Sequence, residues 1–151
     1  MALLGLLLRG WAAGTIQKNE RLTTSGPYAY TRNPLYLGSL LLGIGVSVAG
    51  GAWAWPVLFA TAYLAIYTRT MREEAGRLES IFPGEFPAYR DAVPAFAPSL
   101  RPYRPDEGIP AGAPSFSWSR YVRNREWEAA LGLTGAFVVL ALKWWMAGAG
   151  V

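Results

Sequence analysis

One uncharged run limits how this chain can fold, because no Asp, Glu, Lys or Arg occurs from Leu35 to Thr68. A single straight helix over this run would reach about 50 Å, whereas the hydrocarbon core of a bilayer is about 30 Å thick. The segment Ala49-Gly50-Gly51-Ala52 lies in the middle of the run and Pro56 follows it. Such residues are typical of a helix end and a restart. The run therefore predicts a tight transmembrane helical hairpin over residues 35–71.

The charges on either side of this hairpin predict its orientation. Arg32 precedes the first arm, residues 35–48, and Arg69 and Arg72 lie at the end of the second arm, residues 53–71. An excess of Lys and Arg is typical of the cytoplasmic side of a membrane. Both ends of the hairpin are therefore expected at the cytosolic face.

Two further apolar segments complete the expected fold. Residues 1–14 are apolar apart from Arg9 and are shorter than the roughly 20 residues of a full span. They predict a short or partial membrane helix. Residues 127–147 are expected to form a C-terminal membrane helix. The predicted fold class is all-α, a polytopic helical membrane protein with a single membrane domain over residues 1–151.

Composition excludes many chemistries for the remaining, cytosolic segment at residues 72–126. The chain has no cysteine and no histidine, which excludes disulfides, cysteine nucleophiles, Cys/His zinc sites and imidazole-based triads. No metal site is expected. The net charge is +4, but the basic residues flank apolar segments and form no patch for nucleic acid. The expected partners are the bilayer and a small molecule, and the oligomeric state is not predicted.

The first group of residues that could carry chemistry lies just before the hairpin. Asn33 is expected as the N-cap and Pro34 as the first helical residue. Free N–H groups at a helix start bind anions, Arg32 adds a cation, and Tyr30 and Tyr36 offer π faces. A helix start with interfacial anchors explains the same residues without any ligand.

The second group is the carboxylate pair Glu73 and Glu74. Neighbouring residues on a helix point about 100° apart, so this pair cannot act as one metal clamp. Glu73 can pair with Arg77 at i+4, whereas Glu74 has no such partner four residues away. A carboxylate near the membrane without a local partner invites a ligand cation. The two groups together predict an interfacial site for a zwitterion.

The two groups also resemble the signatures of integral-membrane methyltransferases, namely the isoprenylcysteine carboxyl methyltransferase and phospholipid methyltransferase families. The first signature is Gly-Pro-Tyr-Ala-Tyr-Thr-Arg-Asn-Pro-Leu-Tyr-Leu-Gly at residues 26–38. The second comprises Glu73-Glu74, Leu78, Phe82, Tyr89 and Val93-Pro94. This resemblance covers residues 15–98 and implies a membrane enzyme that binds S-adenosylmethionine at its cytosolic face. The residues it assigns to the cofactor are Arg32, Asn33, Pro34, Tyr36, Gly38, Glu73, Glu74 and Tyr89.

The resemblance implies methyl transfer to a lipid or hydrophobic acceptor, with a prenylcysteine-like carboxylate as one candidate. A carboxylate arrives ionised and needs no base, whereas an amine must lose a proton with help from Glu73, Glu74 or a tyrosine. No catalytic residue is predicted. The candidate acceptor contacts are Tyr30, Arg72, Asn124 and Arg125, and for the last two an interfacial anchor of Arg and Trp is the favoured explanation. The alternatives are a phospholipid N-methyltransferase, a non-catalytic membrane subunit and an NADPH-dependent sterol-reductase-like protein. The expected location is a bacterial or archaeal inner membrane, with the site on the cytosolic side.

Overall fold

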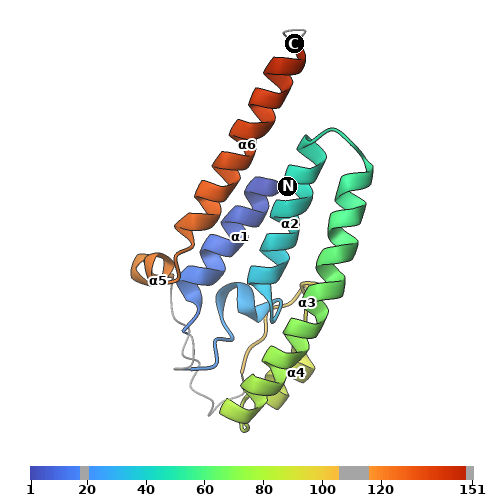
Figure 1. The fold of residues 1–151 in the computed structure, drawn as a ribbon. Coiled ribbons are helices and arrows are strands. Elements are labelled where there is room, and N and C mark those ends of the chain that lie inside the picture. The colour runs from blue at the N-terminus through green and yellow to red at the C-terminus, as the bar shows by residue number, and fades with distance from the viewer. Residues whose placement is uncertain (18–20, 106–115, 149–151) are drawn as a thin grey trace.

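The computed structural model describes residues 1–17, 21–105 and 116–148, and every regular element in these ranges is helical. Figure 1 shows their arrangement. The elements are α1 (Ala2–Thr15), η1 (Gly26–Ala29), α2 (Pro34–Ala49), α3 (Ala54–Ile81), α4 (Phe86–Ala92), α5 (Trp118–Arg123) and α6 (Trp127–Gly148). The predicted all-α class is confirmed for this part of the chain. The short helices α4 and α5 were not predicted.

Helices α1 and α2 touch along their backbones because glycines face each other. A Cβ atom added at Gly5 would lie 2.5 Å from the Gly38 carbonyl oxygen, and one added at Gly38 would lie 2.6 Å from Arg9 Cγ. Near the start of α1, Gly45 meets the backbone of Ala2. Side chains larger than hydrogen would therefore force the two helices apart.

Helices α2 and α3 run in opposite directions and are joined by a short turn (Figure 1). Gly51 has φ +89° in this turn, a conformation that glycine adopts without a steric penalty. The two helices correspond to the two expected arms, and α3 continues ten residues beyond position 71 to Ile81. The ring of Phe59 packs against Gly43 between them.

Membrane-crossing character is clear for one helix of the described residues. Helix α6 is long and apolar enough to span a bilayer, whereas α1 and α2 are shorter apolar helices. The polytopic arrangement therefore stays a prediction. Figure 1 shows α6 reaching beyond the ends of α1 and α2. Only 6% of the most apolar stretch of α6 is buried against the rest of the protein.

The chain after α4 runs back along the segment that precedes α2. The backbone N–H of Arg32 donates to the Pro94 carbonyl at 3.0 Å, and that of Ser99 donates to the Tyr30 carbonyl at 2.8 Å. A buried cluster lies nearby and comprises Leu22, Phe86, Tyr89 and Val93. These contacts fasten the second signature to the first.

Helix α5 fastens the C-terminal part of the chain to the end of α1. Asn124 donates from Nδ2 to the Ala13 carbonyl at 2.8 Å, and Arg120 donates from Nε to the Gly14 carbonyl at 2.9 Å. Arg125 has φ 55°, and among the described non-glycine residues it alone has a positive φ. This sharp elbow between α5 and α6 directs Asn124 and Glu126 toward the other helices.

Candidate functional site

A cavity of about 520 Å³ lies between α1, the start of α2, the charged half of α3 and the α5–α6 elbow. Its volume is within the range of about 300–1,000 Å³ that is typical of small-molecule sites. The polar residues that line it are Arg9, Gln17, Arg21, Thr23, Tyr28, Arg32, Asn33, Tyr36, Ser39, Tyr67, Glu74, Arg77, Tyr89, Asn124 and Glu126.

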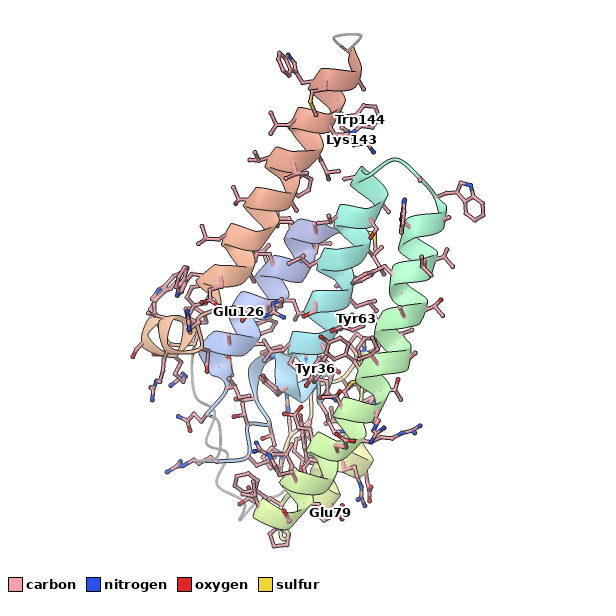
Figure 2. The ribbon with its side chains drawn as sticks, viewed as in Figure 1. Tyr36, Tyr63, Glu79, Glu126, Lys143 and Trp144 are labelled. Carbon is pink, nitrogen blue, oxygen red and sulfur yellow. The ribbon has the colours of Figure 1, made fainter. Side chains whose placement is uncertain are left out.

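Glu74 is the carboxylate of the Glu73–Glu74 pair that lines the cavity. The hydroxyl of Tyr36 donates to Glu74 Oε2 at 3.2 Å, and so connects the first turn of α2 to α3. The hydroxyl of Tyr63 donates to the Tyr36 carbonyl at 3.0 Å. Figure 2 shows Tyr36 and Tyr63 between the two helices. The first bond holds the Glu74 side chain in place, and the second ties the same turn of α2 to α3.

Glu73 lies on a different face of α3 and does not line the cavity. Its side chain is 65% exposed and accepts a hydrogen bond from Arg69 Nε at 2.9 Å. The ion pair that was expected as an alternative to a ligand role for Glu73 is present, but its partner is Arg69, one turn earlier, and not Arg77, which lines the cavity. The cofactor assignment of Glu73 has no support from this geometry.

The start of α2 carries four of the predicted cofactor residues, Arg32, Asn33, Pro34 and Tyr36. The helix begins at Pro34 with Asn33 in the N-cap position, as predicted, but the Asn33 side chain makes no cap hydrogen bond. Its Nδ2 donates instead to the Ala95 carbonyl at 2.8 Å. Arg32 is half-buried in the cavity wall, and its Nε has no partner among the described residues. Burial lowers the pKa of the Arg32 guanidinium, which stays charged because arginine titrates far above neutrality.

Two buried tyrosines form the floor beside Arg32. Tyr89 is 2% exposed, and its hydroxyl donates to the Tyr28 carbonyl at 2.7 Å. Tyr28 is 6% exposed, and its own hydroxyl has no hydrogen-bond partner in the described part of the chain. Burial raises the pKa of both hydroxyls, so both stay protonated donors. A buried polar group without a partner calls for a specific explanation, and a bound ligand supplies one for Tyr28 and Arg32.

An ion pair between α1 and the α5–α6 elbow also lines the cavity. Arg9 Nη2 donates to Glu126 Oε2 at 3.0 Å, and Arg9 Nη1 donates to the hydroxyl of Ser39. Glu126 is 5% exposed, and Figure 2 shows it at the base of α6. The pair joins α1, α2 and the elbow. Neither residue was predicted as part of the site, although Arg9 carried a signal as the one charged side chain within the apolar residues 1–14.

Of the remaining predicted residues, one lines the cavity and the others lie outside its lining. Gly38 faces α1, where it permits a close helix approach. Asn124 lines the cavity, whereas Tyr30, Arg72 and Arg125 do not. Of the predicted residues, the cavity thus brings together Arg32, Asn33, Pro34, Tyr36, Glu74, Tyr89 and Asn124.

Metal ligands do not gather in this part of the molecule. No group of three or more His, Cys, Asp or Glu residues within the described ranges is arranged to hold a metal ion. The groups that the cavity lining offers to a ligand are charged side chains, aromatic faces and hydrogen-bonding groups.

The sequence matches known proteins over much of its length. The sequence model described as phospholipid methyltransferase matches residues 3–85. A cobalt-zinc-cadmium resistance protein of Cupriavidus metallidurans is 35% identical over 125 residues, which are 82% of this chain and 56% of that protein. A nickel-cobalt-cadmium resistance protein of Alcaligenes xylosoxydans is 33% identical over 106 residues, 69% of this chain and 48% of that protein.

A third relative has an enzyme's name. A protein-S-isoprenylcysteine O-methyltransferase of Schizosaccharomyces pombe is 30% identical over 83 residues, which are 55% of this chain and 35% of that enzyme. The chain thus spans about half the length, or less, of the curated relatives it matches. No solved structure was found to match it.

Proposed function

The chain belongs to the phospholipid methyltransferase family, and from this premise we propose that it transfers a methyl group from S-adenosylmethionine to a lipid or hydrophobic acceptor. The observation that carries the proposal is a single cavity that contains Arg32 from the first signature and Glu74 from the second. We propose that this cavity lies at the cytosolic face of a bacterial inner membrane.

The residues that line the cavity fit the charged end of this cofactor. Its α-ammonium group matches the carboxylate of Glu74, and its α-carboxylate matches the guanidinium of Arg32, whose Nε is buried without a partner in the described residues. The unpartnered hydroxyl of Tyr28 offers a further hydrogen bond. Charge-assisted hydrogen bonds of this kind are about twice as strong as neutral ones.

When bound, the cofactor supplies a methyl group that its sulfonium centre has already activated. The chain then has to position groups and exclude water. Tyr36 orients Glu74 through its hydrogen bond. Leu78, Phe82 and Phe86 give the cavity an apolar wall beside these polar groups.

We place the acceptor at the end of the cavity formed by Arg9, Ser39, Asn124 and Glu126. An ionised carboxylate needs no base, whereas an amine must lose a proton to a group such as a lining carboxylate. The enzyme of Schizosaccharomyces pombe is named for a carboxylate acceptor, while the family is described by phospholipids. A carboxylate acceptor is our first candidate and a phospholipid amine is the second.

Binding measurements on the purified protein in lipid nanodiscs test the cofactor part of the proposal. Glu74→Gln should weaken the binding of S-adenosylmethionine and S-adenosylhomocysteine at least tenfold, because a hydrogen bond to a charged group contributes about 1.5–3 kcal/mol. Glu73→Gln is the matched control. It should change neither affinity by more than about twofold, because exposed ion pairs contribute little.

Isothermal titration calorimetry separates the alternatives. Wild-type protein that binds neither compound would favour a non-catalytic membrane subunit, and tight binding of NADPH in their place would favour a reductase. Equal losses in the Glu74 and Glu73 variants would contradict the assigned site. Transfer of a labelled methyl group into a membrane lipid extract then identifies the acceptor as an ester or an amine.

A further inference from the structure

A ladder of aromatic rings on α3 ends at the cavity. Phe59, Tyr63 and Tyr67 follow one another at intervals of four residues, which places them on one face of the helix. The rings of Phe59 and Tyr63 have centroids 5.6 Å apart, and Tyr63 stacks on Tyr67 at 4.2 Å. Of the three, Tyr67 belongs to the cavity lining. Tyr63, which is 7% exposed, covers one side of Tyr67 and holds its ring in place.

A second ring and a carboxylate meet Tyr67 in the cavity wall. The ring of Tyr36 is tilted by 48° to that of Tyr67, with centroids 5.2 Å apart. The hydroxyl of Tyr36 reaches Glu74, which is two helical turns along α3 from Tyr67. The cavity therefore has one wall made of two π systems next to a carboxylate.

Such a wall selects for positive charge. The face of an aromatic ring is electrostatically negative and attracts a cation within about 6 Å of its centroid. The attraction is stronger where water is excluded. A neutral group of the same shape gains only van der Waals contact from the same rings.

We propose that Tyr67, together with Tyr36, recognises the positive sulfonium centre and gives the site a preference for the methyl donor over its neutral thioether product. The inference rests on the proposed function and assigns Tyr67 as a specificity-determining residue. In S-adenosylmethionine the ammonium and the sulfonium belong to one short chain. A cofactor whose ammonium meets Glu74 therefore presents its sulfonium to the adjoining wall.

This preference has a consequence for turnover. Methyl transfer moves the methyl carbon from sulfur to the acceptor, which supplies the electron pair of the new bond. The carbon–sulfur bond breaks and its electron pair stays on sulfur, so the positive charge on sulfur disappears. The wall then loses its electrostatic contact with the product. Release of S-adenosylhomocysteine is thereby favoured over release of the unreacted donor.

The test measures the ratio of two dissociation constants, that of S-adenosylhomocysteine divided by that of S-adenosylmethionine, by calorimetry in nanodiscs. Tyr67→Leu should lower this ratio about fivefold, since a cation–π contact contributes about 1 kcal/mol. Tyr67→Phe keeps the π face and should keep the ratio within about twofold of wild type.

Phe59→Leu is the matched control, because Phe59 belongs to the same ladder and lies outside the cavity lining. It should lower the melting temperature and leave the ratio unchanged. Equal weakening of both ligands in Tyr67→Leu, or an unchanged ratio, would overturn the inference while leaving the proposed function intact. Wild-type protein that binds neither ligand would overturn the proposed function itself.

Discussion

At the scale of single residues, the two buried tyrosines Tyr28 and Tyr89 have different roles despite similar burial. Tyr89 uses its hydroxyl within the protein, on the Tyr28 carbonyl, whereas the hydroxyl of Tyr28 has no partner in the described ranges. The resemblance drew attention to Tyr89 as a cofactor residue. The unpartnered hydroxyl makes Tyr28 the stronger candidate for contact with a ligand.

Removing each hydroxyl should therefore have opposite effects. Tyr28→Phe should leave the ligand-free protein as stable as wild type or more stable, because it removes a buried group that lacks a hydrogen bond. It should weaken cofactor binding about fivefold, the equivalent of one hydrogen bond of about 1 kcal/mol. Tyr89→Phe should destabilise the protein by about 1 kcal/mol or more. Thermal unfolding with and without S-adenosylhomocysteine measures both quantities, and a destabilised Tyr28→Phe protein would contradict this assignment.

The carboxylate pair shows how far sequence reasoning reaches at this scale. The absence of a helical partner four residues away distinguished Glu74 from Glu73 in the sequence, because side-chain spacing on a helix is known in advance, and only Glu74 of the two lines the cavity. The choice of Arg69 over Arg77 as the partner of Glu73 could not be predicted in this way, since both are four residues distant. Arg69 pairs with Glu73 while Arg77 lines the cavity, and the position of a cavity depends on tertiary structure.

At the scale of elements, the interface of α1 and α2 depends on the absence of side chains. A Cβ at Gly5 would lie 2.5 Å from the Gly38 carbonyl oxygen and 2.6 Å from the Leu42 backbone nitrogen, and backbone atoms cannot rotate away. Gly5→Ala should therefore destabilise the protein by about 1–3 kcal/mol, as overpacking does. It should also weaken ligand binding, because Arg9 on α1 lines the cavity.

Gly76→Ala provides the comparison for this substitution. Gly76 lies in α3, and a Cβ there would meet nothing within 4 Å. Alanine in the interior of a helix is about 0.5–1 kcal/mol more favourable than glycine, so this variant should be stabilised. Chemical unfolding in detergent micelles checks both values. A neutral Gly5→Ala variant would show that α1 and α2 are not held in close contact.

Helix ends were predictable where a residue type dictates them, and the connections between helices were not. Pro34 fixed the start of α2 and the glycine pair at residues 50–51 fixed the turn, since their backbone preferences are local. The elbow at Arg125 and the return of residues 93–103 along the start of α2 depend on contacts between distant segments. For the same reason the pairing of Arg9 with Glu126 could not be predicted from the sequence.

At the scale of the whole molecule, apolar side chains cover the outside of the helices. Leu3 on α1, Ile66 on α3 and Val139 on α6 are each more than 60% exposed. Exposed apolar surface on this scale is typical of a membrane or protein contact. Exposed tryptophans lie at the α2–α3 turn and near the C-terminal end of α6, namely Trp53, Trp55, Trp144 and Trp145. Such a group is typical of an interfacial aromatic belt. These features support the predicted polytopic arrangement, in which α2 and α3 cross the bilayer together with α6.

The natural absence of cysteine allows a direct test of that arrangement, because a single introduced thiol is the only one in the chain. Ala52→Cys places it in the exposed α2–α3 turn, and Ser80→Cys places it near the exposed end of α3. Helix α2 is about 24 Å long at 1.5 Å per residue, close to the thickness of a hydrocarbon core. A membrane-impermeant maleimide should therefore label Ala52→Cys only from outside intact cells and Ser80→Cys only in inverted vesicles. Both variants should label after detergent solubilisation, and labelling of both from the same side would show that α2 and α3 do not cross the membrane.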